Sequence, residues 1–343
     1  MDSAPFLGHL RSLPFYRDQI AHIEPIPPRE ARFGDLERPL PPQVEAKIRA
    51  KGLFPLYSHQ TQALNALRRG ENVAVATPSA SGKSLIYNLA ALERLVSEKG
   101  STALYLFPTK ALAQDQWRGL RELAMPDFLA EEEAGAYDGD TPVQERASIR
   151  RRARVVFTNP DMLHVGILPN HAAWSRFLRR LRLVVVDEAH TYRGAFGSHM
   201  ALVLRRLRRL CAAYGSRPRF VLCSATLANP GEMAQRLVGL PCEVVTEDGS
   251  PSGGKDFVLW NPPLLDRGRA GRRSPNTEAA TILSELLRWG VRSLAFARTR
   301  KLTELIYMYC RDALDKNGEA AVAGRLRPYR AGYLPEVRRE IET

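Results

Sequence analysis

The sequence lacks long apolar segments and has few cysteines. No stretch of about 18 uninterrupted apolar residues occurs among its 343 residues, so a membrane-spanning helix is not expected. The first 20 residues are interrupted by prolines and arginines and lack the apolar core of a secretory signal, so the default expectation is a cytoplasmic protein without a membrane partner. The four cysteines, Cys211, Cys223, Cys242 and Cys310, form no CxxC pair, which disfavours a zinc site or a disulfide framework.

Lysine is scarce as well, although the protein is strongly basic. Only 8 of the 50 basic residues are lysines, and with 37 acidic residues the formal net charge is +13. A charge of this size makes polyanions plausible partners, nucleic acid above all. Arginine-favouring codons of a GC-rich genome also explain the composition, and charge alone does not separate the two explanations. The hydrophobic fraction of 44% excludes wholesale disorder, and the length is that of about two domains.

From residue 43 onward, short apolar segments of strand type alternate with amphipathic segments of helix type. The predicted strands are Val73–Ala76, Ala103–Phe107, Val155–Thr158, Leu183–Asp187 and Phe220–Ser224. The predicted helices between them are Ser84–Ser97, Ala111–Leu123 and Gly197–Tyr214. This alternation predicts an α/β fold, a parallel sheet with helices on both faces. In such sheets the loops at the carboxyl ends of the strands form the ligand site.

Proline and glycine divide the chain into four predicted segments. Residues 1–42 contain six prolines between positions 25 and 42, which predict an N-terminal extension, since proline interrupts helices and central strands. Residues 43–248 contain the first α/β domain, and the Pro- and Gly-rich residues 249–277 are predicted to be a linker. A second α/β unit is expected over 278–343, with helices Glu278–Trp289 and Lys301–Lys316 and strands Ser293–Ala297 and Ala321–Ala323. Two strands leave its sheet uncovered, so this unit is expected to be incomplete.

The first predicted strand is followed directly by a candidate phosphate-binding loop. Its residues are Thr77, Pro78, Ser79, Ala80, Ser81, Gly82, Lys83 and Ser84. In a strand–loop–helix of this kind, backbone N–H groups and the helix N-terminus surround phosphate oxygens. Lys83 would reach the β- and γ-phosphates of ATP, and the Ser84 hydroxyl would bind Mg²⁺. The strict pattern has glycine where this chain has Thr77, and taken alone the loop is also explained as a capped helix start.

Two adjacent carboxylates follow another predicted strand, in the tetrapeptide Asp187-Glu188-Ala189-His190. Asp187 is suited to the Mg²⁺ shell, and Glu188 is suited to orient and deprotonate the attacking water. The next strand ends in Ser224-Ala225-Thr226, and the two hydroxyls are predicted to hydrogen-bond His190 and so couple the motifs. An acidic turn that caps the next helix is the alternative for the tetrapeptide alone. Three motifs on three strand ends in this order favour a site for ATP, with Lys83, Asp187, Glu188 and His190 as catalytic residues.

With these motifs the sequence resembles the superfamily 2 helicases of the DEAD/DEAH-box type. The ordered motifs are 58–60, 80–84, 108–112, 158–161, 187–190, 224–226 and 296–300. Longer stretches, among them 190–199 and 329–333, are similar to the bacterial mitomycin-repair (MrfA-like) DNA helicases and their fungal relatives. The similarity covers most of the chain from about residue 23, and the chain is expected to be the N-terminal part of such a protein.

The resemblance implies a RecA-like first lobe, the start of a second lobe, and ATP-driven movement along DNA in a repair role. Gln60 would read the adenine edge and Phe54 or Tyr57 would pack on the base, whereas the plain alternative for Gln60 is a polar residue at a helix start. Groups after three further strands would contact the phosphates of one strand. These implied contacts are Pro108, Thr109, Lys110, Thr158, Asn159, Asp161, Arg298 and Arg300. Helix capping explains Thr109 and Asp161 almost as well.

Two features of the family are missing after Arg300, namely the second-lobe motif Gln-x-x-Gly-Arg-x-Gly-Arg and a C-terminal cysteine cluster. Both, with the remainder of the second lobe, are expected in the full-length protein. Because a missing arginine finger typically costs about 10³–10⁵ in rate, the chain is expected to bind ATP–Mg²⁺ weakly and to hydrolyse it poorly. An RNA helicase, a nucleic-acid-binding lobe without turnover and a small-molecule kinase are the alternatives. DNA is favoured over RNA as the partner.

Overall fold

A computed structural model describes residues 3–265, 271–333, 337 and 340–341. The chain divides into two compact units, of which the larger is Arg29–Ser252 and the smaller combines Met1–Pro28 with Gly253–Thr343. The larger unit is built on a seven-stranded sheet in the order β4-β5-β3-β6-β7-β2-β8, with every neighbouring pair parallel. The strands are β2 (Val73–Ala76), β3 (Thr102–Leu106), β4 (Ala134–Ala136), β5 (Val155–Thr158), β6 (Leu181–Val186), β7 (Arg219–Ser224) and β8 (Glu243–Val245).

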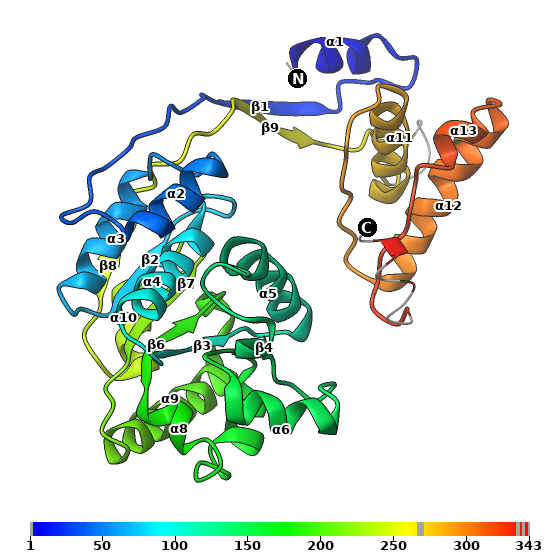
Figure 1. The fold of residues 1–343 in the computed structure, drawn as a ribbon. Helices are drawn as coiled ribbons and strands as arrows, with labels where there is room; N and C mark the ends of the chain where they lie inside the picture. Colours follow the sequence, from blue (N-terminus) through cyan, green and yellow to red (C-terminus); the bar gives the residue numbers. More distant parts are fainter. Residues whose placement is uncertain (1–2, 266–270, 334–336, 338–339, 342–343) are drawn as a thin grey trace. The chain divides into compact units, whose positions relative to one another are not determined.

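Helices cover both faces of this sheet (Figure 1). Val73 and Val75 of β2 belong to the core under α3 (Ser58–Arg68) and α4 (Lys83–Ser97), whereas Ala74 belongs to the core under α9 (Gly194–Ala213) and α10 (Pro230–Val238). Successive strand residues point to opposite faces, so a strand between two helix layers is apolar throughout. The remaining helices of the unit are α2 (Pro42–Ala50), α5 (Lys110–Ala124), α6 (Val143–Arg152), α7 (Pro160–Met162) and α8 (Ser175–Arg179).

The predicted α/β architecture of this unit is confirmed. All five predicted strands and all three predicted helices form, with boundaries that differ by at most three residues. The sequence analysis missed β4 and β8, which are three residues long and stand at the two ends of the sheet. The Ala-Gly-Ala sequence of β4 has no β-branched or aromatic residue, so it carries no local strand signal.

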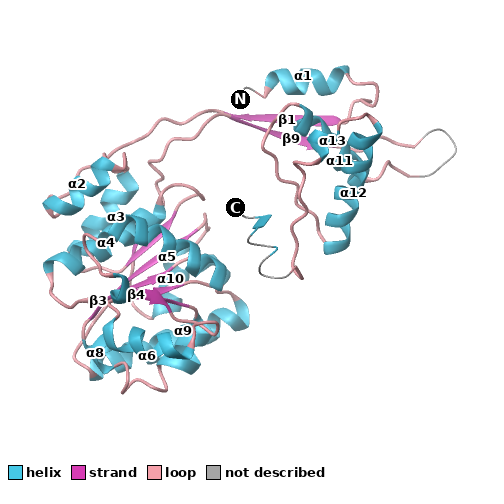
Figure 2. Cartoon of the chain, turned by 45° about the vertical axis from the view of Figure 1, so that its right-hand side comes forward, coloured by secondary structure: helices cyan, strands magenta, loops and turns pink. Residues whose placement is uncertain are grey.

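The smaller unit combines residues from both ends of the sequence (Figure 2). Its two-stranded sheet pairs β1 (Ile20–Ile26) with β9 (Lys255–Trp260) in antiparallel orientation. Helices α11 (Pro275–Arg288) and α12 (Arg300–Lys316) pack on each other through Ala280, Leu283, Ile306 and Cys310. Two short helices, α1 (Ala4–Ser12) and α13 (Ala320–Ala323), complete it.

Two strand predictions in the smaller unit are wrong. Residues 293–297 form no strand, because no strand of the described residues pairs with them, and Leu294 and Phe296 are 86% and 94% exposed. Residues 321–323 lie in helix α13, since alanine is the best helix former. The assignment of 278–343 to the start of a second RecA-like lobe stays a prediction.

The segments predicted as an extension and a linker contain paired strands. Strand β1 lies within predicted extension 1–42, and β9 lies within predicted linker 249–277, of which residues 266–270 are outside the described part. Pro25 sits opposite Asp256 in this pair, and proline is tolerated there because a two-stranded sheet has only edge strands. The contact-based division at 28/29 and 252/253 therefore differs from the predicted boundaries at 42/43, 248/249 and 277/278.

None of the helices in the described part of the chain combines the length and the apolar character that crossing a bilayer requires. Cys211, Cys223 and Cys310 are buried and Cys242 is half-buried. Burial raises the pKa of the Cys211 and Cys242 thiols to about 11 in each case, so both are uncharged at neutral pH.

Candidate functional site

The loop between β2 and α4 closes through contacts among its own residues. Thr77, which stands where the strict pattern has glycine, is fully buried, and its hydroxyl lies 2.7 Å from the Ser81 hydroxyl. Gly82 has a φ of +82°, and a Cβ there would lie 2.7 Å from Nε2 of Gln60, so only glycine fits. Ala80 also has a positive φ of +63°. Thr77 therefore stabilises the loop from its buried side, whereas residues 78–80 are exposed.

Lys83, the first residue of α4, lies across this loop. Its Nζ donates hydrogen bonds to the carbonyl oxygens of Thr77 at 2.9 Å and Pro78 at 2.7 Å. The ammonium group is thus held by two main-chain carbonyls beside the exposed loop residues. An anion bound there would replace these carbonyls as the hydrogen-bond acceptor of Lys83. Ser84 is the next residue, half-buried at the first turn of the helix.

Asp187 lies at the carboxyl end of β6 and is tied directly to α4. Its Oδ2 accepts a hydrogen bond from the Tyr87 hydroxyl at 3.0 Å, and its Oδ1 accepts one from the Glu188 N–H at 2.9 Å. Burial raises the pKa of Asp187, and the two hydrogen bonds and the charge of Lys83 oppose this rise. Tyr87 stands one helical turn after Lys83, so α4 brings the lysine and the aspartate to the same edge of the sheet.

Glu188 and His190 continue from this point toward β7. Glu188 has a φ of +49°, a left-handed conformation that is uncommon for a residue with a side chain. Its Oε2 lies 3.3 Å from Nδ1 of His190. The Ala225 N–H donates to the same Nδ1 at 3.3 Å, so the main chain, and not the predicted hydroxyls, links the two motifs. The Oγ of Ser224 is buried without a partner among the described residues, and Thr226 is exposed.

Gln60 and Tyr57 lie beside the loop, whereas Phe54 packs elsewhere. Gln60 is 2% exposed, and its amide joins Tyr57 to the loop: Oε1 accepts from the Tyr57 N–H at 2.9 Å, and Nε2 donates to the Gly82 carbonyl at 3.0 Å. The Phe54 ring is covered by the Arg49 guanidinium at 3.7 Å and packs against the core. Of the two aromatic candidates, Tyr57 is therefore the one next to the loop.

Phe33 is an aromatic residue that the sequence analysis missed. Its ring stacks on Tyr57 with centroids 5.6 Å apart and planes 19° from parallel, and it is 53% exposed. No local motif marks this residue, because it reaches Tyr57 through an isolated bridge between distant parts of the chain.

The residues predicted to contact nucleic acid follow β3 and β5, at the same edge of the sheet. Thr109 accepts the Leu112 N–H at 3.4 Å and Asn159 accepts the Met162 N–H at 2.8 Å, so both cap helices, whereas Asp161 caps none. The Thr158 hydroxyl is buried and donates to the Tyr137 carbonyl at 2.6 Å, so its side chain is already engaged. The half-buried Pro108 and the exposed Lys110 lie here too, and Lys110 pairs with Asp140 at 2.7 Å. Arg298 and Arg300 are exposed residues of the smaller unit.

A family model described as DEAD/DEAH box helicase matches residues 57–233, about half of the chain. The chain belongs to this family. The matched region contains the loop 77–84, Asp187–His190 and Ser224–Thr226, and the predicted recognition is thereby confirmed.

Several relatives of this helicase chain are similar over nearly its whole length. The ATP-dependent helicase HRQ1 of Saccharomyces cerevisiae is 45% identical over 97% of the chain, and the uncharacterized ATP-dependent helicase YprA of Bacillus subtilis is 42% identical over 95%. The chain spans 31% and 43% of the length of these two relatives. A solved structure of the DUF1998 helicase MrfA bound to DNA and AMPPNP aligns with 99% of the chain at 40% identity and a TM-score of 0.91, and the chain covers 46% of it. The RecA-like fold with its parallel sheet agrees with that structure.

His59 is a second residue of this helicase chain that the sequence analysis left without a role. It is fully buried between the loop and the segment that ends the larger unit. Its Nδ1 accepts the Gly249 N–H at 3.1 Å, so Nε2 carries the proton and donates to the Ser81 carbonyl at 3.0 Å. Only the neutral ring with this tautomer makes both bonds. His59 therefore joins the loop between β2 and α4 to the segment around Gly249.

We expect His59 to make the stability of the chain depend on pH. Burial lowers the pKa of His59 below its ordinary value of 6.5, with the charge of Asp248 opposing this shift. The unfolded chain therefore takes up this proton first as the pH falls, and folding stability decreases from about pH 6.5 downward until the folded pKa is reached. Thermal unfolding of the wild type and of His59→Gln at pH 7.5 and 5.5 tests this. The pH-dependent loss should be smaller in the variant, and an equal loss in both would contradict the assignment.

Proposed function

We propose that this chain is the ATP-binding part of an ATP-dependent DNA helicase. The hydrogen bond from Tyr87 of α4 to Asp187 of β6 supports this most directly, because it brings the lysine of the loop and the acidic motif to one sheet edge. In this family such an arrangement serves ATP hydrolysis, and three separate strand ends contribute to it here.

The loop and the acidic motif fit a nucleoside triphosphate with Mg²⁺. The triphosphate would lie on the loop, and the Lys83 ammonium would exchange the carbonyls of Thr77 and Pro78 for phosphate oxygens. Ser84 and the Asp187 carboxylate are hard oxygen ligands of the kind that Mg²⁺ takes from a protein when phosphates supply the rest. The cation would stabilise the charge that develops on the phosphates, and it would favour the ionised carboxylate that burial disfavours.

Glu188 would act as the general base toward the attacking water. Its side chain is partly exposed and its Oε2 lies 3.3 Å from Nδ1 of His190, so the carboxylate is accessible to water. A movement of His190 would be transmitted to Ala225, the residue directly after β7, through the hydrogen bond that the Ala225 N–H donates.

The base of the nucleotide would stack on the exposed Phe33 ring, which Tyr57 supports from behind. Both polar ends of the Gln60 amide are engaged in the chain, so Gln60 would recognise adenine only by exchanging the bonds to Tyr57 and Gly82. This exchange would connect base recognition to the position of the loop.

One strand of DNA would follow the ends of β3 and β5, with phosphates near Pro108, Thr109, Lys110, Asn159 and Asp161. Thr158, whose hydroxyl is engaged, would contribute through its main chain. Arg298 and Arg300, which are exposed on the smaller unit, are proposed as further nucleic-acid contacts of that unit. MrfA, a similar protein, has been solved bound to DNA, which supports DNA over RNA as the partner. The resemblance to the mitomycin-repair helicases is the ground for proposing a role in DNA repair.

The test measures ATP hydrolysis by the chain extended to the length of its relatives, with matched single-stranded DNA and RNA oligonucleotides. We expect DNA to stimulate hydrolysis clearly more than RNA does. Equal or greater stimulation by RNA would replace the DNA assignment with an RNA helicase. Binding of both ATP and DNA without any stimulated hydrolysis would leave a nucleic-acid-binding lobe without turnover.

A further inference from the structure

A basic groove lies at the amino-terminal ends of the strands, on the side of the sheet opposite the candidate nucleotide site. It lies where β7 begins, between the end of α9 and the end of α10, and its volume is about 720 Å³. Five arginines line it, namely Arg205, Arg208, Arg209, Arg217 and Arg219, and the described residues contribute no carboxylate to the lining.

Two of these arginines hydrogen-bond main-chain carbonyls at the end of α10. Arg205 donates to the Arg236 carbonyl at 3.0 Å, and Arg208 donates to the Val238 and Gly239 carbonyls at 2.9 and 3.1 Å. They occupy the carbonyls that the end of α10 leaves unpaired. Arg209, Arg217 and Arg219 are exposed, and within the described residues their side chains have no hydrogen-bond or ion-pair partner. Their charges are therefore available to a ligand.

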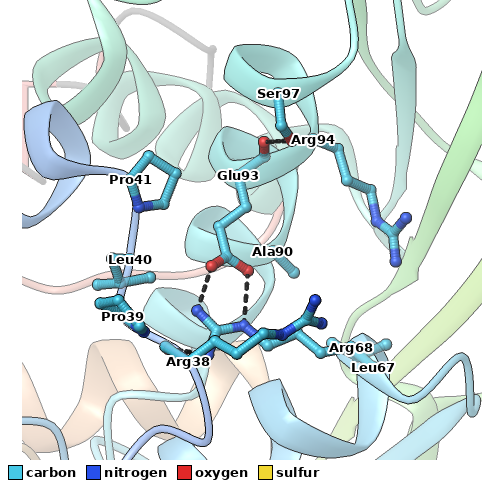
Figure 3. Close-up of a pocket in the computed structure, with 10 residues that line it drawn as sticks. All are labelled: Arg38, Pro39, Leu40, Pro41, Leu67, Arg68, Ala90, Glu93, Arg94 and Ser97. Carbon is cyan, nitrogen blue, oxygen red and sulfur yellow. Dashed lines mark hydrogen bonds and ion pairs between the residues drawn. The ribbon is translucent and has the colours of Figure 1, made fainter.

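Arg94 on α4 extends this basic edge beyond the groove. Figure 3 shows Glu93 bound by the two nitrogens of Arg68, while the Arg94 guanidinium points away from that pair. Burial lowers the pKa of Arg94; Glu93 and Glu98 oppose this shift, and the charges of Arg219 and Arg182 add to it. Arg182 pairs with Glu98 at 2.7 Å, whereas Glu93 and Glu98 act on Arg94 only through their charges.

We propose that Arg209, Arg217 and Arg219, here called the arginine edge, bind the phosphate backbone of duplex DNA. This proposal rests on the proposed function and adds a second DNA contact to it. The planar guanidinium fork matches phosphate oxygens, and unpaired arginines on α9, on β7 and between them suit a repeating anion better than a single small one. The β-strands have four to six residues and span about 13–20 Å, so the arginine edge is separated by about that distance from the carboxyl ends, where the single strand is proposed to bind. The arginine edge is therefore assigned to a second DNA segment, which is double-stranded.

The experiment compares the double variant Arg217→Gln/Arg219→Gln with a control of equal charge, Lys51→Gln/Arg151→Gln, whose residues are exposed on the same unit outside the groove. Affinity of the 343-residue chain for a blunt duplex and for a single strand is measured between 50 and 300 mM salt. Each lost phosphate contact lowers the salt slope for a duplex by about 0.9. We therefore expect the edge variant to lose about 1.8 units of slope and about 10-fold or more in duplex affinity at 150 mM salt. The control should match the wild type, and single-strand binding should be unchanged in both.

The outcomes separate this proposal from the proposed function. Equal duplex binding by the edge and control variants overturns the arginine edge and leaves the helicase assignment intact. An equal loss for duplex and single strand overturns the choice of a duplex. Binding of polyglutamate that is lost in the edge variant, while duplex binding is equal in the edge and control variants, replaces DNA with an acidic protein partner. If the chain binds neither single strand nor ATP while the duplex difference persists, the proposed function fails and the arginine edge stands.

A second variant separates a loss of DNA binding from a loss of folding. Arg209→Gln changes one exposed residue on α9 and leaves the bonds from Arg205 and Arg208 to the end of α10 in place. We expect an unchanged thermal midpoint and a slope loss of about 0.9. A normal midpoint with an unchanged slope contradicts the proposal.

Discussion

Replacing Lys83 by alanine is expected to lower the affinity of the chain for ATP by about 100-fold or more. The Lys83 ammonium donates to two main-chain carbonyls of the loop, and in the complex it would donate to phosphate oxygens instead. A hydrogen bond to a charged group contributes about 1.5–3 kcal/mol, so two phosphate contacts amount to roughly 3 kcal/mol or more. The measurement is a titration with a fluorescent ATP analogue in the presence of Mg²⁺.

The matched control for this substitution is Lys99→Ala, which removes the same charge from an exposed position on the same unit. We expect Lys99→Ala to bind the analogue like the wild type. Unchanged affinity in Lys83→Ala would mean that the loop 77–84 does not hold the triphosphate. Thermal unfolding of both variants separates a loss of binding from a loss of folding, because Lys83 also makes two bonds within the loop.

Replacing Glu188 by glutamine is expected to reduce ATP hydrolysis by about 10²–10⁴-fold while ATP binding is retained. Glutamine has nearly the shape of glutamate but does not accept a proton, so the loss isolates the general-base step. Glu188 makes no contact with the loop residues in its described hydrogen bonds, and its carboxylate reaches only His190. Single-turnover hydrolysis of radiolabelled ATP, with the chain extended to the length of its relatives and in excess over ATP, measures the slow rate that we expect.

The control for Glu188→Gln is Glu145→Gln, an exposed glutamate on α6 of the same unit. This variant should hydrolyse ATP at the wild-type rate. Hydrolysis at the wild-type rate in Glu188→Gln would exclude Glu188 as the base. A loss of both binding and hydrolysis would instead indicate that Glu188 holds the nucleotide or its Mg²⁺.

The motifs of the site were predictable because each is a short segment at the end of a strongly apolar strand. The strands Val73–Ala76 and Val155–Thr158 form with the predicted boundaries, since their residues are buried on both faces of the sheet. The absence of a strand at 293–297 was not predictable in the same way. The apolar residues of this segment give the local signal of a strand, but a strand forms only when a neighbour supplies hydrogen bonds.

Sequence alone determined which residues stand on the phosphate loop and in the acidic motif, because neighbours in the chain are neighbours in a loop. Only the tertiary structure decided how these residues are held. Gln60 bonds to Gly82, His59 connects Ser81 to Gly249, and the Ala225 main chain, not the Ser224 or Thr226 hydroxyl, reaches His190. Each of these contacts joins residues more than 20 positions apart, and such pairs meet only once the sheet has fixed the strand order.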